Sequence, residues 1–239
     1  MFKKILFSVI ILSTQSIASN SDIIKNLLPV FGAINEKNIV ETPFNGVYEI
    51  IFNNPIGSQL VSADGKYLIK GKIIDLKTFA PLKTSARVNA LKRNLINAID
   101  DKDKIIFKAK DEKYIIHIFT DVDCPFCKKL HRQMSKMNAL GITVKYLASP
   151  LASLHPTAQG KMEKIWCAKN KVKAMNDYKT KNIVPDVEKC DNPVARQLLL
   201  SQQLGVNGTP AIFLSDGTHI PGYMPADKLL QTIKRTLGK

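Results

Sequence analysis

The sequence predicts a mixed α/β (α+β) fold made of two modules joined by a helix. From Gly46 to Leu76, branched and aromatic residues around an Asp-Gly turn indicate β-strands. From Asp101 onward, apolar strands alternate with helical segments. With 45% hydrophobic and 23% charged residues among 239, the composition is that of an ordinary globular protein. There is enough chain for one large domain or two small ones.

Residues 1–19 have the pattern of a secretory signal peptide. Lys3 and Lys4 precede a short apolar run, Ile5 to Leu12, and the small-x-small sequence Ser16-Ile17-Ala18 follows. The apolar run is well below the roughly 20 residues that a membrane-spanning helix needs. We therefore expect cleavage after residue 18 or 19 and a soluble, exported protein in a compartment where disulfides persist.

The net charge of +15 falls to +13 when Lys3 and Lys4 are removed (15 − 2). The remaining lysines are spread along the chain among acidic residues, and aromatic residues make up only 7%. No compact basic run with interleaved aromatics is present, so we expect a solvated basic surface and no nucleic-acid partner. Such a charge can still favour acidic partners.

The N-terminal module is expected to span residues 20–81. A helix at its start places Ile23, Leu27 and Val30 on one face, and "GVYEIIF" and "KYLIKGKIIDL" are strand candidates. The Asp-Gly pair within residues 63–66 predicts a tight hairpin. This module contains no cysteine or histidine and is too small for a generous core, so association with a second copy is a natural way to stabilise it.

A connecting helix is expected between the modules, over residues 82–100. The segment from Thr84 to Asp100 lacks Gly and Pro and repeats apolar residues at three- and four-residue steps: Val88, Leu91, Leu95, Ala98 and Ile99. We interpret it as a semi-rigid linker.

The second module, residues 101–239, has the element order of a thioredoxin-like domain. "KIIFKA" and "KYIIHIFTD" are strands, "PFCKKLHRQMSKMNAL" is a helix and "GITVKYLA" is another strand. A helical insertion from about residue 156 to 204 follows. "TPAIFLSDGTHIPGY" predicts a hairpin and "PADKLLQTIKRTL" a closing helix.

Cys124 and Cys127 form a Cys-x-x-Cys pair where the apolar strand ends and a helix begins. The pair can be a redox dithiol, half of a metal site or a structural disulfide. A helix N-terminus stabilises a thiolate, and Pro125 suits the first helical position. We therefore expect Cys124 to attack and the deeper Cys127 to resolve. Such a short loop gains little closure entropy, which suits a bond that is made and broken.

Cys167 and Cys190 lie 23 positions apart (190 − 167) inside the insertion and should pair in an oxidising compartment. We expect a structural disulfide contributing about 3 kcal/mol. A metal site could use Cys124, Cys127 and His131 with one of these cysteines, but structural zinc sites usually show two close ligand pairs and only one exists here. We therefore predict no metal. A histidine in the position of His131 is more often a surface residue.

Thr209-Pro210 directly precedes an apolar strand. Proline cannot donate to a sheet ladder, so its place beside a redox site predicts a cis peptide bond. Thr209 would then present its backbone to an extended substrate segment.

Together these residues resemble the DsbC/DsbG family of exported bacterial protein disulfide isomerases. The matching segments are "FTDVDCPFCKKLHRQM", "GVNGTPAIFLSDGTHIPGYMP", "LVSADGKYLIKGKIIDL" and the second cysteine pair. The resemblance implies a periplasmic, V-shaped homodimer with cystatin-like N-terminal dimerisation domains and thioredoxin-like catalytic domains facing a cleft. It implies Cys124 as nucleophile, Cys127 as resolving cysteine and Thr209-Pro210 as the substrate loop. It further implies a membrane thiol reductant of DsbD type, misoxidised or unfolded exported proteins as substrates, and no cofactor.

Two features depart from the pattern of similar proteins. The active-site dipeptide is Pro125-Phe126, where similar isomerases often carry Gly-Tyr, and it shapes the thiol pKa and the reduction potential. Thioredoxins carry a buried acid six residues before the first cysteine, and Ile118 stands there instead. The function expected first is a disulfide isomerase with chaperone activity. The alternatives are a dimeric dithiol oxidase or reductase of DsbG-like type and, from a different class, a metal carrier or holdase.

Overall fold

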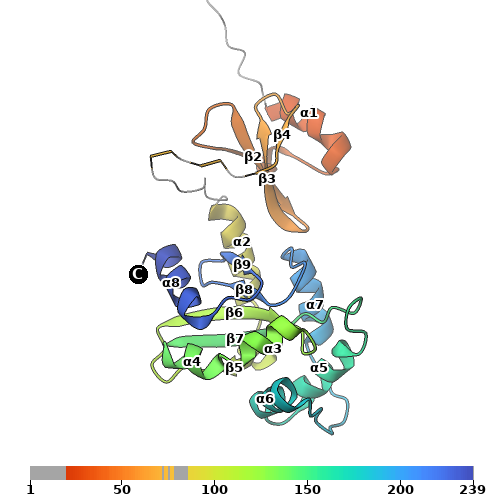
Figure 1. The fold of residues 1–239 in the computed structure, drawn as a ribbon. Coiled ribbons are helices and arrows are strands. Elements are labelled where there is room, and N and C mark those ends of the chain that lie inside the picture. The colour runs from red at the N-terminus through yellow and green to blue at the C-terminus, as the bar shows by residue number, and fades with distance from the viewer. Residues whose placement is uncertain (1–19, 72, 75, 78–85, 239) are drawn as a thin grey trace, which may run out of the picture. The chain divides into compact units, whose positions relative to one another are not determined.

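The computed structural model describes residues 20–71, 73–74, 76–77 and 86–238, so the expected signal peptide lies outside the described residues. The described chain forms two compact units, which are considered separately (Figure 1). None of the helices within these ranges has both the length and the apolar character needed to cross a membrane.

Residues 20–71 combine a helix with a four-stranded sheet of order β1-β2-β3-β4. Strands β1 and β2 pair antiparallel, as do β3 and β4. The elements are α1 (Asn20–Phe31), a 3-10 turn η1 (Glu36–Asn38), β1 (Ile39–Glu41), β2 (Val47–Asn53), β3 (Ile56–Ser62) and β4 (Leu68–Ile69).

The predicted Asp-Gly hairpin joins β3 to β4. Gly65 has φ +68°, and a Cβ there would lie 2.8 Å from the Cα of Ile23, so both the left-handed backbone and the approach of α1 require glycine. Asn26 of α1 donates to the carbonyl of Asp64 at 2.8 Å. The hairpin covers α1 at these positions, and Ile23 and Leu27 are buried as expected. Val30, expected on the same face as these two residues, is not buried with them and is 70% exposed.

The strand predicted from residue 66 to 76 is shorter than expected. β4 contains only Leu68 and Ile69, which pair with Val61 and Leu60. Gly71 follows with φ +143°, a conformation that ends the extended run.

The connecting helix α2 spans Ala86–Asn97, so it ends three residues before the predicted Asp100. Asp100 instead caps the 3-10 turn η2 (Asp101–Asp103) by accepting from the Lys102 amide at 3.0 Å. Residues 82–85 lie outside the described chain. The helix buries Val88 and Ile96, whereas Ala98, assigned to the apolar face, is exposed.

Helix α2 packs against the turn before β9. Asn89 donates to the hydroxyl of Thr218 at 3.2 Å, and a Cβ on Gly217 would fall 1.9 Å from the Asn89 carbonyl oxygen. This contact requires glycine at 217, and it ties α2 to the C-terminal unit. The helix therefore does more than space two modules.

The C-terminal unit contains a five-stranded sheet of order β5-β7-β6-β8-β9 (Figure 1). Strands β6 and β7 are parallel, and the other neighbours pair antiparallel. Central strand β6 is buried as predicted. The elements are β5 (Ile105–Phe107), β6 (Tyr114–Thr120), α3 (Pro125–His131), α4 (Met134–Ala139), β7 (Ile142–Ala148), α5 (Ala158–Cys167), α6 (Lys171–Lys181), α7 (Val194–Gln203), β8 (Ala211–Phe213), β9 (His219–Pro221) and α8 (Ala226–Leu237).

The single helix predicted after the Cys-x-x-Cys pair is divided into α3 and α4. The division lies at Arg132 and Gln133. Gln133 accepts from the Ala226 amide at the start of α8 at 2.8 Å and donates to the hydroxyl of Tyr223. The Gln133 side chain thus accepts a hydrogen bond from the first turn of a helix 93 residues away. No local sequence pattern reveals this contact.

The helical insertion, α5 to α7, is part of the main core. Met162, Trp166, Met175 and Tyr178 belong to the same buried cluster as the strand residues. The indole of Trp166 donates to the Asp103 carbonyl at 2.8 Å. The insertion therefore packs against the sheet as part of the hydrophobic core.

Candidate active site

Cys124 is the N-cap residue of α3, directly after the loop that leaves β6. Its backbone is extended (φ −61°, ψ 123°), and Pro125 occupies the first turn of the helix. The Cys124 carbonyl accepts the first helical hydrogen bond from the Lys128 amide at 3.0 Å. The apolar strand and the following proline thus place Cys124 where helix amides point toward it, as the sequence predicted.

The buried carboxylate of Asp121 holds the loop between β6 and α3. One of its oxygens accepts from the Asp123 amide at 2.7 Å and from the Cys124 amide at 3.3 Å. The other accepts from the Leu151 amide at 2.7 Å and from the His155 Nδ1 at 3.0 Å. Asp121 is fully buried, so this single side chain joins the Cys124 loop to the loop after β7. Sequence reasoning missed both Asp121 and His155, although an aspartate directly after a buried strand is a usable signal.

The loop of Thr209 and Pro210 closes over the first cysteine. The peptide bond between them is cis, as predicted, and the Cys124 sulfur lies 3.3 Å from the Thr209 carbonyl oxygen. The Pro210 carbonyl accepts from the Gly222 amide at 2.9 Å, which anchors the loop beside β9. Loop and dithiol, 85 residues apart in sequence, therefore meet at one point.

The two sulfurs differ in their electrostatic surroundings. The pKa of Cys124 is lowered to about 5, chiefly by a hydrogen bond from the Cys127 thiol, with the Cys127 and Phe126 amides and Thr209 also contributing against the cost of burial. Burial and the interaction with Cys124 raise the pKa of Cys127 well above 9. Both cysteines are free in the structure. At neutral pH the first is therefore a thiolate and the second a thiol.

We expect alkylation of Cys124 to show an acidic pH midpoint. Because only the thiolate reacts, the rate of iodoacetamide modification should be constant above about pH 6 and fall as the pH is lowered through the Cys124 pKa of about 5. The measurement is mass spectrometry of the reduced protein quenched over a pH series, with Cys127→Ser as the variant that reports Cys124 alone. Loss of the Cys127 thiol should itself move the midpoint upward. A midpoint near the ordinary cysteine pKa in the unmodified chain would contradict this electrostatic account.

The dipeptide between the cysteines forms the outer surface of the site. Pro125 is exposed, and the Phe126 ring is 59% exposed. An exposed aromatic ring beside a reactive sulfur offers an apolar contact to an approaching chain.

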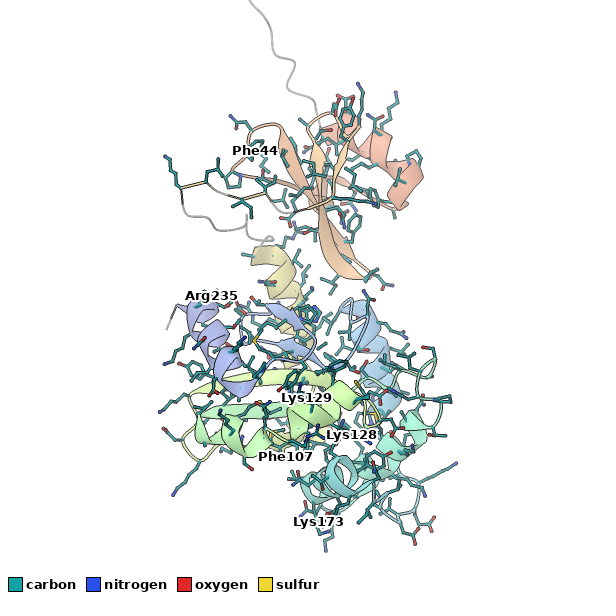
Figure 2. All side chains as sticks on the ribbon, viewed as in Figure 1. Phe44, Phe107, Lys128, Lys129, Lys173 and Arg235 are labelled. Carbon is teal, nitrogen blue, oxygen red and sulfur yellow. A yellow bond between two sulfur atoms is a disulfide. The ribbon has the colours of Figure 1, made fainter. Side chains whose placement is uncertain are left out.

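Two lysines on α3, labelled in Figure 2, have different environments. Lys128 donates to the side-chain oxygen of Asn182 at 2.7 Å and lies 5.5 Å from the centre of the Tyr178 ring. Lys129 lies over the Tyr223 ring at 4.7 Å. Neither lysine is among the principal causes of the low pKa of Cys124.

His131 is buried, which corrects the expectation of a surface residue. Its Nδ1 lies 3.2 Å from the Tyr146 hydroxyl, and its Nε2 lies 2.9 Å from the side-chain oxygen of Asn176. Burial lowers its pKa to about 4. With both ring nitrogens engaged, His131 is not free to be the third ligand of a metal site with the cysteines. Among the described residues, no group of three or more His, Cys, Asp or Glu side chains could hold a metal ion.

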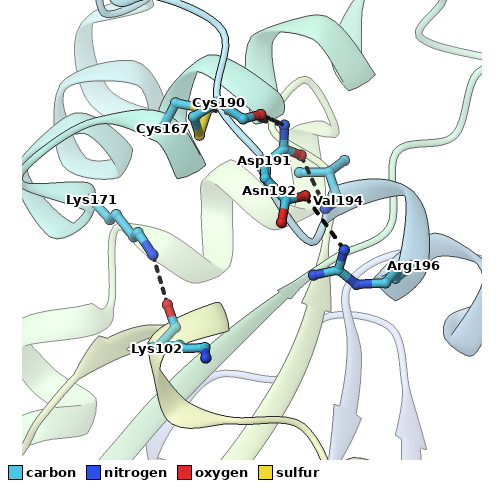
Figure 3. The surroundings of a disulfide bond; sticks show 8 residues. All are labelled: Lys102, Cys167, Lys171, Cys190, Asp191, Asn192, Val194 and Arg196. Carbon is cyan, nitrogen blue, oxygen red and sulfur yellow. Dashed lines mark hydrogen bonds and ion pairs between the residues drawn. A yellow bond between two sulfur atoms is a disulfide. The ribbon is translucent and has the colours of Figure 1, made fainter.

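The second cysteine pair forms a disulfide between Cys167, the last residue of α5, and Cys190, with 5.7 Å between their Cα atoms (Figure 3). Asn192 donates to the Cys190 carbonyl at 3.1 Å and accepts from the Val194 amide at 3.2 Å, which links the bridge to the start of α7. The bridge closes a segment of the insertion and is separate from the Cys-x-x-Cys pair. By the loop-entropy model it contributes about 3 kcal/mol.

Comparisons with known proteins agree with this geometry. Residues 101–237 match a family model described as a thioredoxin-like domain, and residues 14–82 match the N-terminal domain of disulfide bond isomerase proteins. The chain is 39% identical over 211 residues to the thiol:disulfide interchange protein DsbC of Escherichia coli strain K12, covering 86% of each chain. It is 34% identical to DsbC of Haemophilus influenzae over 98% of this chain and 99% of that one.

Solved structures of similar proteins match part of the chain. A disulfide interchange protein from Neisseria gonorrhoeae is 35% identical with a TM-score of 0.53, over 57% of this chain and 97% of that one. The catalytic domain of Proteus mirabilis ScsC, at 22% identity and a TM-score of 0.51, covers 64% of this chain and 99% of its own and shares the fold. On these matches, the chain belongs to the DsbC family of thiol:disulfide interchange proteins, with a thioredoxin-like domain that carries a cysteine pair.

Proposed function

We propose that this protein is a periplasmic disulfide isomerase that reshuffles non-native disulfides in exported proteins through Cys124 and Cys127. The observation that carries the proposal is the pairing of a low-pKa sulfur on Cys124 with a protonated, buried Cys127, beside the cis Thr209-Pro210 loop. Nucleophile, resolving thiol and substrate-facing backbone are thereby assigned to different residues.

In the first step of the proposed reaction, the Cys124 thiolate attacks one sulfur of a wrong disulfide. A bond forms between Cys124 and that sulfur, and the other substrate sulfur leaves as a thiolate. In isomerisation, a substrate thiolate then attacks the mixed disulfide and releases Cys124 with no net change in oxidation. Alternatively Cys127 attacks Cys124, so that the substrate leaves reduced and the protein dithiol becomes a disulfide.

The Thr209-Pro210 loop is proposed to position the substrate. Its cis bond and its anchor to Gly222 hold the Thr209 backbone beside Cys124. An extended substrate segment lying along this loop would present its sulfur to Cys124. The exposed ring of Phe126 would add an apolar contact beside the nucleophile.

Three parts of the chain are proposed to divide the work: residues 20–81 for dimerisation, 82–100 as linker, and 101–239 for catalysis. Family membership supports a homodimer. Within residues 20–81, the side chains of Phe44 (55%), Tyr67 (69%) and Leu76 (80%) are exposed and form apolar surface that a second copy could cover. A dimer with two catalytic domains could hold non-native chains and act as a chaperone. Sedimentation of the mature protein as a monomer would exclude this assembly.

The site also carries one feature of an oxidase. A low pKa at Cys124 stabilises the reduced form, which makes the corresponding disulfide more oxidising. The Pro125-Phe126 dipeptide is also compatible with either an isomerase or an oxidase. A dimeric dithiol oxidase or reductase is therefore the second candidate.

The redox state in the periplasm separates the two candidates. We expect the Cys124–Cys127 pair to be mostly reduced when thiols are trapped with acid and then alkylated, since an isomerase must present a free thiolate. Removal of the cell's membrane thiol reductant of DsbD type should oxidise the pair. A pair that is mostly oxidised in unperturbed cells would favour the oxidase. The Cys167–Cys190 bridge, present in both cases, serves as the internal control.

A further inference from the structure

Lys179, in the last turn of α6, is buried beneath the candidate active site. Only 3% of the residue is exposed. Its Nζ donates to the Asp121 carbonyl at 2.6 Å and to the Thr120 hydroxyl at 3.3 Å. Within the described residues, no carboxylate oxygen lies within ion-pair distance of Nζ. The lysine therefore reaches the end of β6 without a conventional counter-ion.

Burial of a charged ammonium group in such a position is energetically unfavourable. Moving it from water into a protein interior costs several kcal/mol unless an anion compensates. Burial lowers the pKa of Lys179 to about 8, and the groups that oppose this fall are Cys127, Asp121 and Cys124. Asp121 is already engaged by three amides and His155. The thiols remain as groups that can acquire a negative charge here.

Cys127 is the thiol that Lys179 influences most. Cys127 is itself 1% exposed, and the charge of Lys179 lowers the pKa of its thiol against the larger effect of burial. The Thr120 side chain acts on Cys127 in the same direction. Because Thr120 also accepts from Lys179, its hydroxyl connects the ammonium group with the sulfur.

We propose that Lys179 is the positioning residue that stabilises the thiolate of Cys127 and so permits Cys127 to resolve mixed disulfides. The proposal rests on the function proposed for the two cysteines. When the Cys127 thiol gives its proton to solvent, a buried ammonium–thiolate pair replaces the ammonium beside a neutral thiol. The thiolate attacks the Cys124 sulfur, a bond forms between the two cysteines, and the substrate sulfur leaves with the electron pair.

The residue at position 118 leaves Cys127 without a buried carboxylate that could accept its proton. Thioredoxins place a buried acid there, and this chain has the fully buried Ile118. Lys179 reaches the dithiol from α6, in the helical insertion, and supplies charge of the opposite sign. A cation stabilises the thiolate directly, whereas a carboxylate would have to accept its proton.

Other groups near the pair act on the same titration. From the loop after β6 come Cys124 and Asp121, and α3 contributes Lys128 and His131. Lys128 lowers the Lys179 pKa, and His131 is neutral at physiological pH with its own pKa of about 4. Mixed-disulfide formation removes the Cys124 thiolate, so Cys127 becomes the remaining thiol that can compensate Lys179 when resolution is required.

The test compares Lys179→Met with Lys173→Met, both made in a Cys124→Ser chain. Cys127 is then the only free thiol, and its thiolate is followed by ultraviolet absorbance against pH. Lys173 lies on the same helix and is exposed, so its loss controls for a change of charge on α6. We expect Lys179→Met to raise the Cys127 pKa by about one unit or more, about tenfold less thiolate at a given pH. An unchanged pKa in Lys179→Met would overturn the proposal.

A second measurement needs no change at Lys179. By linkage, the Cys127 thiolate must raise the Lys179 pKa by as much as Lys179 lowers that of Cys127. In lysine-labelled protein followed by NMR, Lys179 should keep its proton to higher pH in Cys124→Ser than in the chain with both Cys124→Ser and Cys127→Ser. Equal titration in the two chains would overturn the proposal even if Lys179→Met does not fold.

The two proposals fail separately. In a chain with both cysteines, Lys179→Met should still form a mixed disulfide at Cys124 and resolve it about threefold more slowly, because a tenfold smaller thiolate fraction of Cys127 is partly offset by the greater nucleophilicity of a more basic thiolate. Loss of mixed-disulfide formation in a folded Lys179→Met chain would contradict the assigned role. Persistence of disulfide exchange without Cys124 would instead contradict the proposed function.

Discussion

Replacing Cys124 with alanine is expected to abolish disulfide reshuffling, with a loss on the order of 10³-fold or more, because the chain then lacks its proposed nucleophile. The measurement is recovery of ribonuclease activity from scrambled ribonuclease in a glutathione buffer. Alanine at this position removes the sulfur and retains the extended backbone that begins α3. The Asp121 contacts to the loop amides do not involve the sulfur and should persist.

The matched control is Cys127→Ala. It leaves Cys124 able to attack and leaves the substrate's own thiol able to release it. We therefore expect partial reshuffling, together with mixed disulfides that accumulate because Cys127, the proposed resolving thiol, is absent. Its Cys124 should also be less acidic, since the hydrogen bond from Cys127 is the largest cause of the low pKa. Substantial reshuffling by the Cys124→Ala protein would exclude both the isomerase and the oxidase.

The features that the sequence predicted well have local signals. A buried strand followed by Cys-Pro-Phe-Cys and an amphipathic helix specifies the N-cap position of Cys124 within a few residues. The cis bond was predicted from Thr209-Pro210 before a strand, because proline cannot donate to the sheet ladder and this one lies next to a redox pair. The disulfide followed from cysteine spacing and from the compartment implied by the first 19 residues.

The features that it missed depend on tertiary contacts. Lys179 reaches Asp121 across 58 residues, and His155 reaches the same residue across 34. Lys179 lies near the end of a polar helix, so the sequence does not indicate that it is buried. Its burial results from the packing of the insertion against the end of β6. His131 was assigned to the surface on the same grounds, and it is buried because Tyr146 and Asn176 meet it there. Chemistry-bearing sulfurs are thus visible in the sequence, whereas the groups that set their pKa values are not.

Asp121→Ala is expected to have the largest effect on stability, lowering the free energy of unfolding by about 3–5 kcal/mol. The change removes a fully buried carboxylate that is the acceptor for three backbone amides and for the partly exposed His155 ring. Each such group pays its desolvation penalty, and a cavity replaces the carboxylate. The measurement is urea unfolding of the oxidised protein, followed by tryptophan fluorescence, since Trp166 lies in the same core.

Two variants calibrate that loss. Asp227→Ala removes an exposed carboxylate paired with Lys136, and pairs of that kind are worth about 0–1 kcal/mol. Asp121→Asn keeps the shape and one acceptor oxygen but turns an amide donor toward either the Cys124 loop or the Leu151 amide, so its loss should be intermediate. If Asp121→Ala unfolded at the same urea concentration as Asp227→Ala, the network described here would not hold the loop.

Loss of the Asp121 side chain should lower both the stability of the fold and the reactivity of Cys124. The same Asp121 oxygen that accepts from the Asp123 amide also accepts from the Cys124 amide. In the folded fraction of Asp121→Ala, the Cys124 loop loses its anchor, and the helix amides that favour the thiolate lose their fixed direction toward the sulfur. We expect the alkylation midpoint of Cys124 to rise in that fraction. In Asp227→Ala it should stay near pH 5, the pKa of the intact site. A buried carboxylate that stabilises the fold would then also set the acidity of the nucleophile.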